Sequence, residues 1–168
     1  MRLGDGADGA GHAIAAPQLL VARVSFEDFY RDRYPDMVRL ATLLVGSVDT
    51  AQDLVQDCFV KLHPRWTVVT DPLRYVRRSV VNACHSHHRR LRRFRQLGLR
   101  PGDAVELDAD EMADALAALP HRQRAALVLR FYDGLHDAEI AELLGCRTGT
   151  VASLVHRGLA SLRLVIDP

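Results

Sequence analysis

Apolar residues recur at intervals of three and four along most of the chain, the spacing that lines one face of an α-helix. In the first part of the sequence this pattern predicts helices over residues 25–46, 49–63 and 72–95. Pro64 lies where the second pattern stops, and Pro72 lies at a first helical position, which suits its fixed backbone angle. We therefore expect three consecutive helices before residue 98.

The second part of the chain carries the same periodicity in shorter pieces, beginning near Glu111. Residues 122–131 predict one helix that Gly134 ends, Asp137 is the expected N-cap of the next, and Thr148 of the last. The expected inward-facing residues of the last two helices are Ile140, Ala141, Leu143, Leu144, Val151, Leu154, Val155, Leu159 and Leu162. Two short helices separated by Gly-Cys-Arg-Thr have the spacing of a helix-turn-helix.

Composition divides the chain into four segments. Residues 1–24 are rich in Gly and Ala with little periodicity, which predicts a mobile N-terminal extension, and residues 98–110 combine Gly, Pro and acids, which predicts a linker. Residues 25–97 and 111–168 are then two domains. The fold class predicted is all-α, with two small helical domains joined by a short acidic linker.

The chain shows no pattern of a signal peptide or of a membrane span. Its three cysteines, Cys58, Cys84 and Cys146, are scattered and lack the CxxC spacing of a zinc ribbon. We expect a cytoplasmic protein that does not insert into membranes.

The formal net charge of +1 conceals a strong polarity along the chain. Residues 74–100 contain nine arginines, three histidines and no acid, whereas residues 103–114 contain six acids and no base. Arginine makes up 21 of the 22 basic residues, which favours bidentate contacts to phosphates. So many unopposed arginines favour a polyanionic partner, and we hypothesise that the acidic linker screens the basic helix in the free protein.

No motif for catalysis is present: the chain has no P-loop, no GxSxG and no HExxH. Asp53 and Asp57 share a helix face, but such a pair is more often a solvated surface or a protein contact than a catalytic dyad. Cys84, His87 and His88 share another face, yet three ligands from one helix surrounded by arginines do not close a metal site. We expect no enzymatic activity, no cofactor and no bound metal.

Two nucleic-acid interfaces are predicted. In the last helix Thr150, Ser153 and Arg157 lie opposite the apolar face, as insertion into a major groove requires, although two packed core helices would give the same spacing. The arginine-rich third helix is a candidate for phosphate binding. Tyr75 and Trp66 could stack on unpaired bases, and a core role for Trp66 is the alternative.

Several segments together resemble one known family. These are FEDFY at 26–30, DLVQDCF at 53–59, YVRRSVVN at 75–82, LPHRQR at 119–124, and GTV at 149–151 followed by His156-Arg157. Over about residues 26–164 the chain resembles the extracytoplasmic-function (ECF) sigma factors, group 4 of the sigma-70 family, of the actinobacterial kind. The resemblance implies a region 2-like domain and a region 4-like helix-turn-helix domain in a non-catalytic subunit of bacterial RNA polymerase that directs the core enzyme to promoters and assists their melting.

The resemblance also implies which residues make which contacts. Docking on the clamp helices of the largest polymerase subunit falls to Asp53, Gln56 and Asp57. Recognition of the −10 element falls to Arg74, Tyr75, Arg77, Arg78, Asn82, Arg89 and Arg90. Recognition of the −35 element falls to Arg147, Thr150, Ser153 and Arg157. The implied partners are the polymerase core, including the flap of its second-largest subunit, promoter DNA and an anti-sigma factor.

The chain departs from the family pattern at two places. Ala152 and Leu154 replace residues that are usually or often basic, from which we expect altered −35 contacts. Residues 84–88 replace polar and aromatic residues with a histidine-rich run, from which we expect phosphate attraction to rise below about pH 6.5. Two other interpretations stay open: a stand-alone helix-turn-helix regulator, and an interaction module that has lost DNA binding.

Overall fold

The computed structural model describes residues 24–97 and 111–166, and all the regular structure in these residues is helical, as the periodicity predicts. The first group of helices is α1 (Phe26–Val45), α2 (Val48–Leu62), the short 3₁₀ helix η1 (His63–Arg65) and α3 (Pro72–Gln96). The second group is α4 (Glu111–Ala118), α5 (His121–Leu127), the π-helical η2 (Val128–Tyr132), α6 (Asp137–Leu144) and α7 (Thr148–Ile166). We refer to α1–α3 as the first bundle and to α4–α7 as the second bundle.

The first bundle closes around the apolar faces that the sequence predicts. The Ser25 hydroxyl accepts a hydrogen bond from the Asp28 amide at 3.1 Å, and Gly46 ends α1 with a φ of 81°, a conformation that glycine adopts without strain. Phe59 of α2 is buried among the aromatic rings of α1. Trp66 stacks beside this cluster, with its ring centroid 5.0 Å from that of Phe29.

The second bundle contains the predicted helix-turn-helix, with α6 and α7 joined at Gly145 in the left-handed conformation. Several local expectations about it are wrong. The N-cap of α6 is His136, whose backbone N–H donates to the Glu139 carboxylate at 2.9 Å, so Asp137 is already inside the helix. Leu159 is 36% exposed, because its neighbour Gly158 is the residue that packs against α5.

Further corrections concern the ends, the burial and the regularity of the helices. Thr148 is the first residue of α7 and not the cap before it. Leu143 and Leu144 are half-buried, because α6 contributes chiefly Ile140 and Ala141 to the core. The predicted helix over residues 122–131 changes after residue 127 into a π-helical turn, in which the Asp133 N–H donates to the carbonyl oxygen of Val128 five residues earlier.

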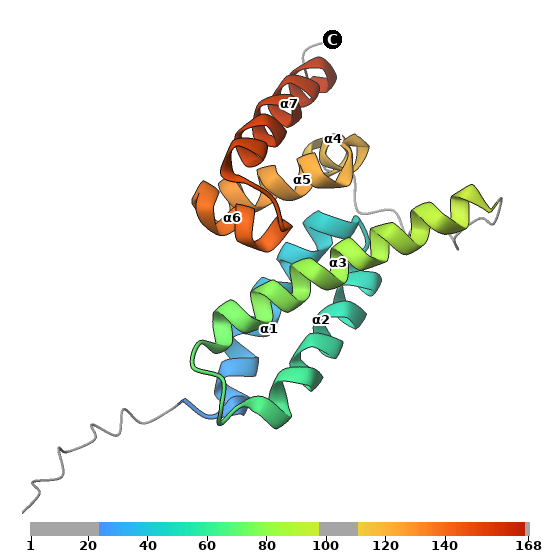
Figure 1. Cartoon of the computed structure of the whole chain (residues 1–168). Helices are drawn as coiled ribbons and strands as arrows, with labels where there is room; N and C mark the ends of the chain where they lie inside the picture. Colours follow the sequence, from blue (N-terminus) through green and yellow to red (C-terminus); the bar gives the residue numbers. More distant parts are fainter. Residues whose placement is uncertain (1–23, 98–110, 167–168) are drawn as a thin grey trace, which may run out of the picture.

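The two bundles pack against each other around α3 (Figure 1). The N-terminal part of α3 lies beneath α6, its middle lies near α5, and its C-terminal end extends beyond both bundles. Buried residues of both bundles form one continuous apolar cluster, from Met37 in α1 to Val155 in α7. The second bundle therefore packs on the first, an arrangement that the periodicity alone does not predict.

Arg124 of α5 connects the bundles at the point where three helix segments meet. Its side chain is buried, and its guanidinium donates to the carbonyl oxygens of Leu44 at 3.0 Å, of Ala117, and of Leu119 at 3.4 Å. These carbonyls lie at the C-terminal ends of α1 and α4, where helix backbone has no partner of its own and where a cation is favoured. One side chain thus caps two helices and joins the two bundles.

A cluster of imidazoles lies beside Arg124. The ring of His121 in α5 is 5.0 Å from that of His85 and 5.5 Å from that of His88, both in α3, while the ring of His87 is 6.0 Å from that of His88. His88 Nε2 lies 2.8 Å from the carbonyl oxygen of Leu44. The cluster packs between the two bundles and is flanked by arginines. These are Arg89, Arg90 and Arg92 of α3 and Arg122 and Arg124 of α5.

Burial and these positive neighbours lower the pKa of each histidine in the cluster. For His121 the pKa falls to about 4, first through burial and then through His85, His88 and the nearby arginines. Burial is also the largest cause of the lowered pKa values of His85, His87 and His88. The expectation that these histidines gain charge below about pH 6.5 is therefore wrong, because they stay neutral to lower pH.

We expect Arg124→Met to lower the free energy of unfolding by about 2–4 kcal/mol, because it removes the guanidinium donor from the carbonyl oxygens of Ala117 and Leu119 and one of two partners from that of Leu44. Arg33→Met, at an exposed position of α1, is the matched control and should change stability by less than about 0.5 kcal/mol. Urea unfolding followed by far-UV circular dichroism measures both, and equal midpoints would contradict this role for Arg124.

We also expect the histidine cluster to make the fold acid-sensitive. The folded-state pKa values lie below the unfolded value of about 6.5, so below that pH the unfolded chain binds protons that the folded chain does not, and stability falls toward about pH 4. Above about pH 7 both states are neutral at these sites and the contribution vanishes. His121→Gln should therefore lose less thermal stability than the wild type on acidification. Identical losses of melting temperature in the two proteins would argue against the cluster.

Candidate nucleic-acid and partner interfaces

The acidic face of α2 is open to solvent. Asp53, Gln56 and Asp57 are all exposed and lie opposite the face that α2 buries in the first bundle. Beside Gln56, a groove of about 340 Å³ between α1 and α2 is floored by aromatic rings and bordered by Val60, which is 63% exposed. Sequence reasoning identifies the acids but misses this apolar border, because Val60 lies outside the regular core pattern.

The basic face of α3 has two different surroundings along its length. In its first two turns Arg74 and Arg78 are exposed, but Arg77 retains only 22% of its side-chain exposure. These three side chains point toward the second bundle and contact its acids, which sequence reasoning misses. Asn82, one turn later, is exposed.

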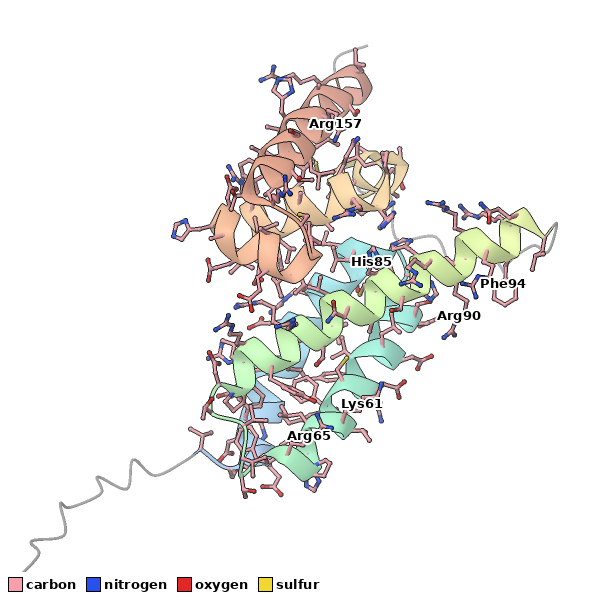
Figure 2. All side chains as sticks on the ribbon, in the orientation of Figure 1. Lys61, Arg65, His85, Arg90, Phe94 and Arg157 are labelled. Atoms are coloured by element: carbon pink, nitrogen blue, oxygen red, sulfur yellow. The ribbon has the colours of Figure 1, made fainter. Side chains whose placement is uncertain are left out.

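The C-terminal end of α3 stands clear of both bundles. Figure 2 shows Arg90 and Phe94 on this projecting end, beyond His85, which lies under the second bundle. Arg89, Arg90, Arg92, Arg93 and Arg95 are all exposed. Such a concentration of exposed guanidinium groups on one end of a helix favours binding to phosphates.

A second pocket lies where the connection before α3 meets α1. Its volume is about 430 Å³, and its walls include Phe29, Trp66, Val69 and Leu73. Trp66 therefore packs in the aromatic cluster and at the same time lines this pocket, so the two interpretations of Trp66 are compatible. Tyr75 lies nearby, and its hydroxyl accepts a hydrogen bond from Arg65 at 3.3 Å.

The helix-turn-helix presents its polar residues together. Arg147, Thr150, Ser153 and Arg157 are exposed, whereas Val151, Leu154 and Val155 are buried. The side chain of Arg157 is positioned by a hydrogen bond from its Nε to the Ser153 carbonyl oxygen at 3.2 Å. Because Leu154 belongs to the core, the expectation of a lost surface contact at this position is wrong. Ala152 is exposed, and the expectation for that position stays a prediction.

The face of α3 that carries Cys84, His87 and His88 is not arranged like a metal site. Cys84 is 2% exposed, and burial raises the pKa of its thiol to about 12, so the thiolate that binds metals is disfavoured. Across residues 24–97 and 111–166, no three His, Cys, Asp or Glu side chains are arranged to hold a metal ion. In the same residues no helix is both long enough and apolar enough to cross a membrane.

Two family models match the chain in order. The model described as Sigma-70 region 2 matches residues 29–94, and that described as Sigma-70, region 4 matches residues 109–162. The RNA polymerase sigma-E factor of Streptomyces coelicolor is 34% identical over 151 positions, which cover 83% of this chain and 85% of the relative. The ECF RNA polymerase sigma factor SigM of Mycobacterium tuberculosis is 31% identical, covering 92% of this chain and 86% of the relative.

Solved structures show the same fold. The sigma factor RpoE of Bartonella quintana, solved in complex with the anti-sigma factor NepR, superposes with a TM-score of 0.66 at 24% identity, covering 84% of this chain and 98% of that one. The structure of CnrH in complex with the cytosolic domain of CnrY superposes with a TM-score of 0.61 at 21% identity, covering 84% of this chain and 87% of that one. From the family models and the identity to the curated relatives, the chain belongs to the ECF group of the sigma-70 family of RNA polymerase sigma factors.

Proposed function

We propose that this sigma factor directs the RNA polymerase core to specific promoters and helps to open them. The observation that carries the proposal is the order of two family regions on one chain, the first with a basic helix and the second with a helix-turn-helix. A stand-alone regulator would have no use for the α1–α3 bundle that matches region 2. An inert module is disfavoured by the exposed arginines on α3 and α7.

Residues 25–97 are proposed as the region 2-like domain and residues 111–168 as the region 4-like domain. The proposed extension before residue 25 and the linker over residues 98–110 fall outside the described residues, apart from residue 24. The idea that linker acids screen α3 therefore stays a hypothesis about undescribed residues.

Polymerase docking is assigned to the acidic face of α2. The exposure of Asp53, Gln56 and Asp57 supports it, since a partner can approach all three side chains at once. The adjacent groove with Val60 supplies apolar area, which a stable protein interface needs besides charge. We propose that this face meets the clamp helices of the largest subunit and that the second bundle meets the flap of the second-largest subunit.

Recognition of the −10 element is assigned to α3 and the connection before it. The arginines Arg74, Arg77, Arg78, Arg89 and Arg90 would hold phosphates, while Tyr75 and Asn82 would contact bases. The pocket with Trp66 lies next to the start of this helix, and its aromatic lining is of the kind on which bases stack. These features suit a DNA strand that has left the duplex.

Recognition of the −35 element is assigned to the start of α7. Arg147, Thr150, Ser153 and Arg157 form one exposed surface that includes the N-terminal turns of the helix, the part of a recognition helix that meets base edges. Ala152 in this surface offers a methyl group where the family resemblance leads us to expect a basic residue. We propose that base readout at this position is apolar or absent.

A protein partner is proposed from two structural relatives that were solved with other proteins, one of them an anti-sigma factor. We propose that this sigma factor also has an anti-sigma factor. It is proposed to act in the cytoplasm, where its polymerase works, and to act without catalysis, cofactor or metal of its own.

We expect purified protein with core polymerase to yield specific run-off transcripts from a cognate promoter. Asp53→Ala with Gln56→Ala should reduce competition for core by about tenfold, roughly 1.4 kcal/mol, because two exposed contacts are lost. Glu27→Gln with Asp32→Asn, at exposed positions of α1, is the control and should compete like the wild type. The absence of transcripts from any genomic template would reject the function, and unchanged competition would reject the docking face.

The projecting end of α3 should bind phosphates regardless of sequence. Arg89→Gln with Arg90→Gln is expected to reduce the slope of log affinity against log salt by about 2, because two phosphate contacts are lost. The charge-matched control is Arg31→Gln with Arg33→Gln on α1. Fluorescence anisotropy with a labelled duplex measures the slopes, and equal slopes for the two variants would refute the assignment.

A further inference from the structure

Three arginines at the start of α3 contact acids of the second bundle. Arg74 Nη2 lies 2.5 Å from Oε2 of Glu142, and Arg78 Nη1 lies 3.3 Å from Oε1 of the same carboxylate. Arg77 Nε lies 2.8 Å from Oδ2 of Asp133, and its Nη2 donates to Oδ1 at 3.3 Å. Glu142 thus accepts from two guanidinium groups and Asp133 from a third.

These contacts use the groups that DNA would need. A carboxylate and a phosphate present similar pairs of oxygens to a guanidinium group, and each arginine has the same N–H donors to offer either one. Helix α6, which carries Glu142, lies over the N-terminal part of α3 (Figure 1), and Asp133 lies just before α6, directly after η2. While the bundles stay together, Asp133 and Glu142 occupy the places of phosphates along this part of the helix.

The ion pairs with Asp133 and Glu142 mask arginines only in the N-terminal half of α3. Asn82, Arg89 and Arg90 stay exposed, as do Thr150 and Arg157 on α7. While the two bundles are packed together, the exposed arginines can still make weak, sequence-independent contacts with DNA. The arginines nearest the pocket with Trp66 cannot. Stable engagement of the −10 region requires the second bundle to leave α3.

The masking contacts have the character of a reversible interface. Glu142 retains 43% of its side-chain exposure, and a cavity of about 330 Å³ opens beside the ion pairs, so water and salt reach them. The Asp133 pair is better buried, with 22% and 13% of the two side chains exposed. Burial also raises the pKa of Asp133, an effect that Arg77 opposes, so this carboxylate is held as an anion with some cost.

We propose that Asp133 and Glu142 act as an internal substitute for DNA phosphates, which keeps the first part of α3 unavailable until the two bundles separate. The proposal rests on the proposed function for the role of α3. In this proposal, docking on polymerase separates the bundles, because each bundle is assigned to a different subunit.

The test compares the full chain with its Asp133→Asn and Glu142→Gln double variant in the absence of polymerase. Binding to a short labelled duplex without promoter elements should tighten by about tenfold at moderate salt. The salt slope should steepen by about 2 to 3, because three arginines become available at about 0.9 per phosphate. Small-angle X-ray scattering should show a larger radius of gyration for the double variant than for the wild type.

Asp32→Asn with Asp114→Asn is the matched control, because it changes the net charge equally at exposed positions, one in each bundle. It should bind DNA and scatter nearly like the wild type. A second variant, Glu142→Arg, changes only an exposed side chain and repels Arg74 and Arg78, so it tests the same contact if the double variant folds poorly. Its own control is Asp114→Arg.

Equal DNA affinity and equal dimensions for wild type and variants would overturn the proposal. An expanded variant whose DNA affinity matches that of the control would overturn it as well, because opening would then expose nothing that binds. With core polymerase, wild type and variants should give equal run-off transcription. If none of them initiates, the proposed function fails, whereas anisotropy and scattering still decide whether Asp133 and Glu142 mask α3.

Discussion

The arrangement of the whole molecule depends on one buried guanidinium. Arg124 on α5 donates hydrogen bonds to carbonyl oxygens at the C-terminal ends of α1 and α4, and so sets the relative placement of the two bundles while they are packed together. Separation of the bundles would break its bond to Leu44, so any partner that separates them must offset this loss. The apolar contacts of the surrounding cluster stabilise the packing but are not directional. The hydrogen bonds of Arg124 are directional, so they determine how the helices are oriented.

The acidic residues of this protein have two different surroundings. On α2 the acids face solvent and are suited to an outside partner, whereas Asp133 and Glu142 are turned inward against α3. The net charge of +1 is set by the composition of the chain, but the fold pairs part of its positive surface with its own acids. A protein that meets a polyanion only in a larger assembly gains selectivity from this balance, because unassisted binding to bulk DNA is weakened.

Much of the fold could be predicted from the sequence, because helices follow from local periodicity. The start of α1 after Ser25, the end at Gly46 and the helix-turn-helix around Gly145 depend on residues close together in the chain. The contacts of Arg77 with Asp133 and of Arg124 with Leu44 could not, because they join residues 56 and 80 positions apart and no alternation of apolar residues encodes them. The π-helical turn could not be predicted either, because helix propensity does not distinguish it from an ordinary α-helix.

The length of α3 has a geometric consequence. A helix of 25 residues is about 37 Å long at the usual rise per residue, close to the length of about 34–36 Å that one turn of duplex DNA occupies. Arginines lie near both ends of this helix, so the positive charge of α3 extends over nearly its whole length. Because α3 also forms part of the core of its bundle, the fold holds these arginines at fixed spacings, and a DNA strand that binds along the helix must adapt to them.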